Sequence, residues 1–231
     1  MKQLIVPEHR RLSWYLAAEE YIGRHYPLTE EVVFFWWVPP TVIYGRHQVK
    51  ENEVNLTYCQ SHGVDLVRRK SGGGCVYADE GNLMTSFISP SPHSEAVFQQ
   101  YLDTMAGALQ RLGVNAVKTE HNDILVSTAE GEHKISGNAC YAIPTGTIVH
   151  GTLLYNVDFD ALQQAITPSP TKLDKHGVAS VRQRVMNIAP MLKVKNVKQL
   201  SECLASDLTD GQLILTEQEI EAINEIEQQN Y

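Results

Sequence analysis

The 231 residues, of which 43% are hydrophobic and 20% charged, have the composition of an ordinary globular protein with enough chain for a buried core. The formal net charge of −8 argues against a broad nucleic-acid-binding surface, because a phosphate backbone requires clustered cations. No apolar run approaches the length that spans a membrane, and the first residues do not resemble a signal peptide.

The four cysteines are scattered along the chain and form no CxxC pair. They are Cys59, Cys75, Cys140 and Cys203. This spacing indicates neither a zinc knuckle nor a redox motif, and scattered thiols are most simply explained as reduced. We therefore expect a cytoplasmic protein that binds neither nucleic acid nor membrane.

The first part of the chain predicts helices separated by short strands. Ser13 predicts the cap of a helix over residues 14–24, and Gly63 predicts the end of a second helix over residues 50–62. Short β-branched and aromatic runs predict strands at 32–38, 41–44, 64–69, 75–77 and 83–88.

The second part predicts a long helix, then strands, then shorter helices. Ser94 predicts the cap of a helix that runs to Leu112. Three strands are predicted at 124–127, 134–143 and 148–155, with a hairpin turn at residues 131–132. Asp158 predicts the cap of a short helix, 197–208 predicts another helix, and a capping box at Thr216 and Glu219 predicts the last one.

This element order predicts one domain over residues 1–231. Strands in closely spaced sets with flanking helices are typical of an α+β fold around a mixed, mostly antiparallel sheet. A regular βαβ alternation is absent, which disfavours a Rossmann fold. We also find no internal repeat and no interdomain linker.

Three glycines (72–74) follow a cluster of cations at the end of a predicted strand: Arg68, Arg69 and Lys70. Glycine weakens strand interiors and is favoured where the backbone takes unusual angles or approaches a ligand closely. Bare N–H groups beside cations predict a concave, positive cradle for an anion such as phosphate. A glycine-rich hairpin turn explains the same residues equally well.

Lys134 begins a later predicted strand, just before Ser136 and Gly137. A lysine held near backbone is a compact point charge that can steady a carboxylate and a phosphate together. An edge-strand lysine that blunts sheet pairing is the simpler explanation for any single lysine. Asp123 is a candidate ligand for Mg²⁺ beside phosphates, with a turn or capping role as its alternative.

Two further candidates lie downstream. Gly151 inside a predicted strand indicates close backbone approach, and His150 before it is either a polar wall of a pocket or a satisfied structural histidine. The basic stretch 172–184 is either a loop that closes over a phosphate-bearing ligand or a solvated surface loop.

Together and in this order, these motifs resemble the lipoate–protein ligase A family, and the resemblance covers nearly the whole chain. The matching stretches are 39–48 (PPTVIYGRHQ), 53–55 (EVN), 68–83 (RRKSGGGCVYADEGNL), 122–124 (NDI), 134–139 (KISGNA), 150–154 (HGTLL) and 177–185 (GVASVRQRV).

The resemblance implies a catalytic domain with the fold of class II synthetases and biotin protein ligases. Such enzymes join lipoate and ATP into lipoyl-AMP and release pyrophosphate, whose charge Mg²⁺ would neutralise. They then pass the lipoyl group to a lysine of a carrier, such as the lipoyl domain of a 2-oxoacid dehydrogenase E2 subunit or the glycine cleavage H protein. A biotin ligase is disfavoured, because its Gly-Arg-Gly-Arg type of adenylate loop is absent.

The resemblance also implies roles for individual residues. Lys134 would be the catalytic residue, in contact with the lipoate carboxylate and the α-phosphate, and Asp123 would bind the metal. Lys172 and Arg182 would belong to a phosphate-binding loop. The residues that would bind lipoate and the adenylate are Arg69, Lys70, Ser71, Gly72, Gly73, Gly74, Cys75, Val76, Tyr77, Ala78, Asn82, Asn122, Ser136, Gly137, His150, Gly151 and Thr152.

The chain departs from the family pattern at several positions. Ala78 stands where the family usually has His, and Cys75 replaces a common Ala. Cys140 and Tyr141 replace more usual polar or basic residues, and His176 stands where Lys is frequent. We expect substrate contacts to differ from those of relatives at these positions.

Two alternatives stay open. A cysteine-dependent octanoyl or lipoyl transferase of the same superfamily needs an activated thiolate, for which Cys75 and Cys140 are poor candidates. A non-catalytic carrier-binding paralogue is disfavoured by the presence of Lys134. Larger family members continue past the position of Tyr231 into a small accessory domain. That domain is expected to come from another chain, to be dispensable here, or to be missing through truncation.

Overall fold

The computed structural model describes residues 1–166 and 185–231. These residues contain eleven strands and the α-helices given below. The strands are β1 (Lys2–Ile5), β2 (Val32–Trp36), β3 (Thr41–Tyr44), β4 (Asp65–Arg68), β5 (Val76–Ala78), β6 (Asn82–Ser89), β7 (Ala116–Lys118), β8 (Asp123–Thr128), β9 (Gly131–Ile143), β10 (Gly146–Leu154) and β11 (Gly211–Ile214). The α-helices are α1 (Leu12–His25), α2 (Lys50–Glu53), α3 (Leu56–His62), α4 (Ser94–Arg111), α5 (Phe159–Ala165), α7 (Val197–Leu208) and α8 (Glu217–Asn230).

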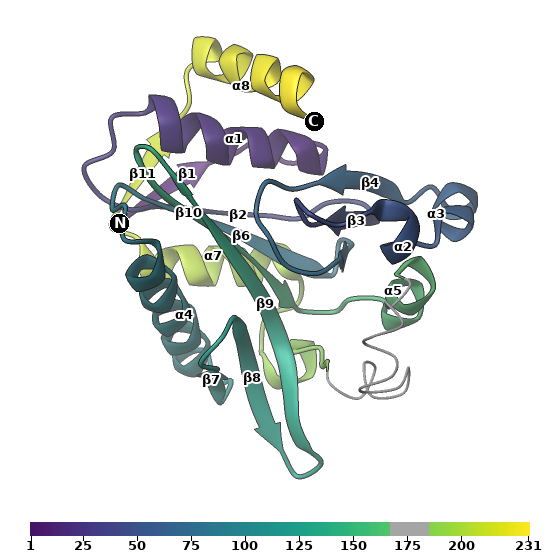
Figure 1. Cartoon of the computed structure of the whole chain (residues 1–231). Coiled ribbons are helices and arrows are strands. Elements are labelled where there is room, and N and C mark those ends of the chain that lie inside the picture. Colours follow the sequence, from purple (N-terminus) through teal and green to yellow (C-terminus); the bar gives the residue numbers. More distant parts are fainter. Residues whose placement is uncertain (167–184) are drawn as a thin grey trace.

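The strands form two sheets (Figure 1). The large sheet has the order β11-β1-β2-β6-β10-β9-β8-β7, and the small sheet has the order β4-β3-β5. Among these pairs, β1 runs parallel to both β11 and β2, and β3 runs parallel to β4, whereas the others are antiparallel. The predicted α+β fold with a mixed, mostly antiparallel sheet is therefore confirmed.

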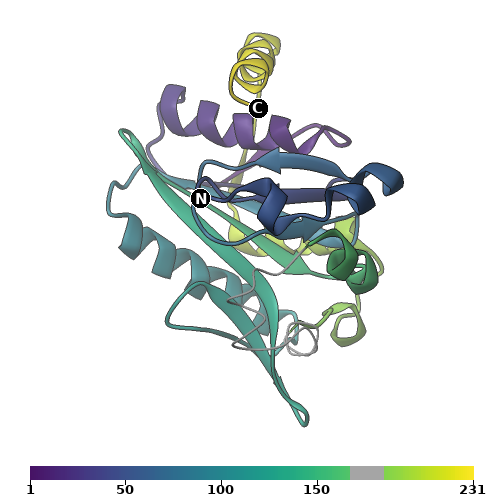
Figure 2. The same cartoon turned by 45° about the vertical axis from the view of Figure 1, so that its right-hand side comes forward.

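Helices cover both faces of the large sheet, with α1 and α8 on one face and α4 and α7 on the other (Figures 1 and 2). The period-2 alternation of a strand divides its side chains between these two cores. In β6, Leu83 and Phe87 pack with α4, whereas Met84 and Ile88 pack with α1. All eight residues of β6 are consequently buried.

A smaller third core joins the small sheet to α3 and α5. Val42 and Tyr77 from the sheet pack there with Cys59 of α3 and Ala165 of α5. The small sheet packs near one end of the large sheet, since Leu154 of β10 belongs to this third core. Ser71, in the loop between β4 and β5, bonds His150 of β10. This loop contains the three glycines.

Several local predictions need correction. The helix predicted over 50–62 is two helices, α2 and α3, because Asn55 interrupts it and caps α3 by accepting from the Tyr58 amide at 3.1 Å. Ser13 does not cap α1; Arg11 is the N-cap residue, and the buried Ser13 hydroxyl donates to Glu227 of α8. Ser94 is likewise the first residue of α4 rather than its cap.

The structure also contains three strands that the sequence pattern did not predict: β1, β7 and β11, each of three or four residues. Across residues 1–166 and 185–231, no helix is both long and apolar enough to cross a membrane.

Candidate functional site

Two cavities lie where the small sheet meets the large one. We call them cavity A, of about 280 Å³, and cavity B, of about 580 Å³. Both cavities are lined in part by Cys75 and Val76, where β5 begins, and by residues of β9 and β10. The residues common to both linings are Cys75, Val76, Lys134, Gly137 and Thr152. A molecule at this shared wall can contact groups in both cavities.

The lining of cavity A combines an apolar wall with a few polar groups. The apolar wall contains Leu16, Trp36, Ile43 and Met84, from α1, β2, β3 and β6. The polar lining residues are Arg69, Asn122, Lys134, Asn138, His150 and Thr152. Such a cavity suits a mostly aliphatic molecule with a polar end.

The Arg69 side chain holds the glycine loop from inside. Its Nη2 donates to the carbonyls of Gly72 and Gly74, both at 2.7 Å, and its Nη1 donates to Ile43 O at 3.2 Å. Its Nε donates to Ser71 Oγ at 3.0 Å. Burial lowers the pKa of this guanidinium below its ordinary value. Arg69 therefore shapes the loop around itself, and its donors point mainly at protein acceptors.

The two neighbouring cations are also held by protein groups. Arg68 Nη1 donates to the carbonyls of Arg46 and Gln48, at 2.9 and 3.0 Å. Lys70 Nζ donates to Glu20 Oε2 at 2.5 Å. The cation cluster thus stabilises the loop, and Lys134 is the lysine that lines both cavities among the described residues.

A buried polar chain runs behind cavity A. The fully buried Glu19 accepts from the Ser86 hydroxyl at 2.6 Å and from His150 Nδ1 at 3.1 Å. His150 Nε2 shares a hydrogen bond with the Ser71 hydroxyl at 2.6 Å. Trp36 Nε1 donates to Ser86 Oγ at 2.8 Å. These hydrogen bonds fix the orientation of the Trp36 and His150 side chains at the cavity.

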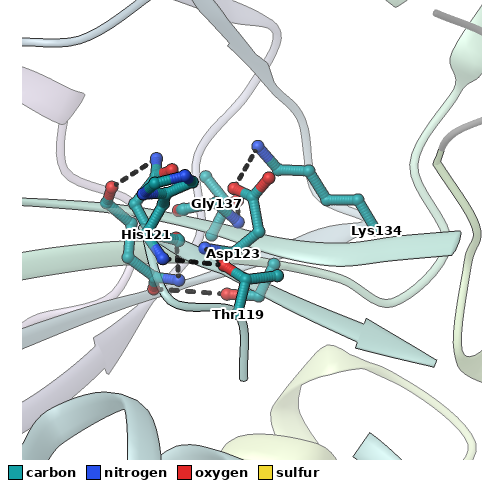
Figure 3. A network of polar contacts seen from close by, with 9 residues as sticks. Thr119, His121, Asp123, Lys134 and Gly137 are labelled. Atoms are coloured by element: carbon teal, nitrogen blue, oxygen red, sulfur yellow. Dashed lines mark hydrogen bonds and ion pairs between the residues drawn. The ribbon is translucent and has the colours of Figure 1, made fainter. Parts of the chain in front are cut away.

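The side chains of Lys134 and Asp123 point toward each other, as Figure 3 shows. Lys134 Nζ lies 2.7 Å from Asp123 Oδ1, and both side chains are about one-third exposed (34% and 29%). The Thr119 hydroxyl accepts from the Asp123 amide at 3.2 Å and holds that turn. A Cβ at Gly137 would lie 2.8 Å from Lys134 Nζ, so glycine leaves the room that the ammonium occupies.

Carboxylates line cavity B around this pair. Asp123, Glu53 and Glu132 all contribute to its lining. Within the described residues, no three His, Cys, Asp or Glu side chains cluster closely enough to hold a metal ion by themselves. Because Mg²⁺ is usually bound through one or two carboxylates together with substrate phosphates, Asp123 fits that role.

The structure places most of the predicted site residues in the two linings. In cavity A it places Arg69, Gly73, Gly74, Cys75, Val76, Asn122, Lys134, Gly137, His150, Gly151 and Thr152. Cavity B adds Tyr77 and Asp123. Lys70, Ser71, Gly72, Ala78, Asn82 and Ser136 line neither cavity. Lys172 and Arg182 lie outside the described residues.

Some residues outside the linings support them from behind. Ser71 bonds His150, and Ser136 donates to Asn138 Oδ1 at 3.2 Å. Asn82 Oδ1 accepts from the Leu153 amide at 3.1 Å and ties β6 to β10. Ala78 is fully buried in the core beside α1.

Glu19 and the apolar wall of cavity A are not among the site residues predicted from the sequence. Leu16 and Trp36 were predicted only as parts of a helix and a strand, where apolar residues are expected in any case. Asn138 lies inside the matched 134–139 motif but is not one of the predicted binding residues. Two adjacent carboxylates, Glu19 and Glu20, within an otherwise apolar helix segment were the available signal for the buried chain.

Of the four cysteines, Cys75 alone lines the cavities. Cys140 packs against the core beneath α4, and burial raises the pKa of its thiol. Burial also raises the pKa of Cys59 in the third core. A raised pKa disfavours the thiolate, so these two thiols are poor nucleophiles.

Comparisons with known proteins identify the family of this chain. The profile of the lipoyl protein ligase A/B catalytic domain matches residues 12–209. Lipoate–protein ligase 1 of Staphylococcus aureus (strain Mu50) is 44% identical over 178 residues, which cover 77% of this chain and 53% of that ligase. The chain therefore spans about half the length of this relative.

Two solved structures share the fold. One is the bi-partite lipoate protein ligase studied with its E2 lipoyl domain from Thermoplasma acidophilum, with a TM-score of 0.85, 26% identity, and coverage of 98% of this chain and 91% of that one. The other is a lipoate-protein ligase A bound with ATP, with a TM-score of 0.82, 24% identity, and coverage of 98% and 94%. With the profile match over most of its length, the chain belongs to the lipoyl protein ligase A/B catalytic domain family.

Proposed function

We propose that this chain is the catalytic domain of an ATP-dependent lipoate–protein ligase. The observation that carries the proposal is the shared wall, where Lys134 lies in the lining of an apolar cavity and of a larger, carboxylate-bearing one. Cavity A suits the lipoyl chain, and cavity B suits ATP. The lipoate carboxylate and the α-phosphate would meet at Lys134.

The first step under this proposal is adenylation. A lipoate carboxylate oxygen attacks the α-phosphorus of ATP, a new O–P bond forms, and the bond to pyrophosphate breaks. Lys134 offsets the repulsion between the two anions and the charge that builds at phosphorus, a type of stabilisation worth about 3–4 kcal/mol when one donor is removed. Asp123 would hold Mg²⁺ beside the phosphates, and the bound ion would supply charge neutralisation for the leaving pyrophosphate.

The second step is transfer to a carrier lysine. The neutral amine attacks the acyl carbon of lipoyl-AMP, a C–N bond forms, AMP leaves with the bonding electron pair, and the nitrogen releases one proton to solvent. The carrier would be the lipoyl domain of an E2 subunit or the glycine cleavage H protein. The bi-partite ligase from Thermoplasma acidophilum, studied together with its E2 lipoyl domain, supports this partner class.

The test is lipoate transfer to apo H protein and to an apo lipoyl domain, followed by mass spectrometry of the carrier and by pyrophosphate release. We expect both signals to require ATP and Mg²⁺. Lys134→Ala should lower the rate by roughly 100- to 1,000-fold. Lys118→Ala is the matched control, because Lys118 pairs with Asp103 at the same 2.7 Å and lines neither cavity.

One alternative rests on a specific observation: Cys75 is a thiol at the shared wall. A transferase would move an octanoyl group from a carrier onto Cys75 without ATP, and Cys75→Ala would abolish all transfer. The ligase retains ATP-dependent transfer in that variant. Lipoyl-AMP formation without transfer in the unaltered chain would indicate that an accessory domain is required.

A further inference from the structure

Helix α8 lies outside the segment that matches the family profile, residues 12–209, yet it packs along α1 (Figures 1 and 2). Trp14 Nε1 of α1 donates to Asn224 Oδ1 of α8 at 2.9 Å. The Ser13 hydroxyl donates to Glu227 one helical turn further on. These bonds fix the rotation of α8, so that its last turn comes to the glycine loop.

Lys70 of that loop is held between α1 and the end of α8. Its Nζ lies 2.5 Å from Glu20 Oε2 and 5.4 Å from the ring centroid of Tyr231, which directly follows α8. Asn230 Nδ2 approaches the same Glu20 oxygen at 3.4 Å. Arg24 Nε donates to the other Glu20 oxygen at 3.1 Å. The Glu20 side chain is only 8% exposed, so little water competes for these contacts.

The Tyr231 ring acts here as an aromatic face for a cation. Burial, with Glu19 and Glu20 nearby, raises the pKa of Tyr231 above its ordinary value, so the phenol is neutral at physiological pH. A neutral ring attracts the Lys70 ammonium without competing with Glu20 for it. The contacts with the Glu20 carboxylate and the Tyr231 ring together restrict the position of the Lys70 ammonium.

What holds Lys70 also holds the start of the glycine loop. The next residue, Ser71, bonds His150 Nε2 at 2.6 Å and accepts from Arg69 Nε at 3.0 Å. His150 lines cavity A, whereas Lys70 and Tyr231 do not. A shift of Lys70 therefore reaches the cavity through Ser71 and His150.

We propose that Tyr231 is a positioning residue for cavity A, which acts through Lys70 and the glycine loop. This inference rests on the proposed function, in which cavity A binds the lipoyl chain. It adds a residue directly after α8 that lines neither cavity, and it predicts an effect on substrate affinity rather than on chemistry.

The experiment measures steady-state kinetics for lipoate in the full chain and in point variants. Tyr231→Ala should raise KM for lipoate about three- to tenfold, the range of a partly desolvated cation–π contact, with kcat changed less than twofold. Tyr231→Phe keeps the ring face and should restore the unaltered KM. Gln229→Ala is the matched control, because Gln229 is exposed on the last turn of α8, next to Tyr231 in the chain.

A double-mutant cycle shows whether Tyr231 acts through Lys70. If it does, Lys70→Met/Tyr231→Ala should have the KM of Lys70→Met alone, because residues in one contact are not additive. Additive effects, an unchanged KM in Tyr231→Ala, or a Phe variant that resembles Ala would each overturn the inference.

Hydrogen exchange separates this inference from the proposed function. The Arg46 amide donates to Ser71 O and the Arg69 amide donates to Tyr44 O, both at 3.0 Å, so these amides report on the loop. Tyr231→Ala should speed their exchange, while Gln229→Ala should not. If the unaltered chain neither binds lipoate nor forms lipoyl-AMP, the proposed function fails, and the exchange result still decides whether Tyr231 holds the loop.

Discussion

Gly151→Ala is expected to destabilise the protein, because no space exists for a side chain at this position of β10. A Cβ there would lie 2.0 Å from Asn138 Oδ1 and 2.5 Å from Tyr101 Oη. Asn138 is buried, and its Nδ2 donates to Asn122 O at 2.9 Å. To make room, the Asn138 side chain must move away from this partner.

The magnitude follows from two contributions. Overpacking of a buried site costs about 1–3 kcal/mol, and a lost hydrogen bond costs about 1 kcal/mol more. Their sum of about 2–4 kcal/mol corresponds to a Tm lower by roughly 5–15 °C for a chain of this length. Urea unfolding and a thermal melt followed by circular dichroism measure both quantities.

Gly72→Ala is the matched control for stability. A Cβ at Gly72 meets no atom of the described residues within 4 Å, so the free energy of unfolding should change by less than about 0.5 kcal/mol. If Gly151→Ala lowers the free energy of unfolding as little as this control does, then the contact with Asn138 does not prevent a side chain at position 151. Because Asn122 lines cavity A, a higher KM for lipoate should accompany the loss of stability.

Three further changes test the buried contacts. Arg69→Lys should lower the free energy of unfolding by about 2 kcal/mol and raise KM for lipoate, because an ammonium cannot replace the forked bonds to the glycine loop. Glu19→Gln should cost about 2–3 kcal/mol in urea unfolding, because a buried amide cannot accept from both Ser86 and His150. Burial raises the pKa of Tyr77, so its stabilising share is full below about pH 10 and is lost as pH rises through the folded-state pKa. Urea unfolding between pH 9 and 11 should show a fall of up to about 1.4 kcal/mol per pH unit from this group, which Tyr77→Phe removes.

A specific result would contradict each of these three predictions. An Arg69→Lys variant with unchanged KM would mean that the loop keeps its shape without the guanidinium. A silent Glu19→Gln would show that the carboxylate charge does not hold His150. An identical pH slope in Tyr77→Phe would mean that other groups cause the alkaline loss.

The fold was predictable where its cause is local. The bounds of α7 and the capping box of α8 agree with prediction, because helix periodicity and capping depend on residues within one turn. Strands β1 (KQLI) and β11 (GQLI) were missed because each has a single β-branched residue and no aromatic residue, unlike the predicted β3 (TVIY). Their order comes from parallel pairing between Lys2–Ile5 and Gly211–Ile214, which no local signal encodes.

The same distinction applies to the site. Lys134 and His150 were identified because they sit in motifs, and the structure places both in the lining of cavity A. Glu19 was missed because a carboxylate on an amphipathic helix is usually solvated. Its burial results from the packing of α1 against β6 and β10, which brings Ser86 and His150 to it from distant parts of the chain.

The pairing of β1 with β11 has a consequence for how the protein is made. Strand β1 is synthesised well before its partner Gly211–Ile214, because most of the fold lies between the two strands in the chain. Until then, one edge of β1 exposes unpaired N–H and C=O groups, and the face of α1 that α8 covers is bare. A nascent chain that stalls before residue 211 therefore exposes the unpaired edge of β1 and the apolar face of α1. Chaperones would be expected to bind there.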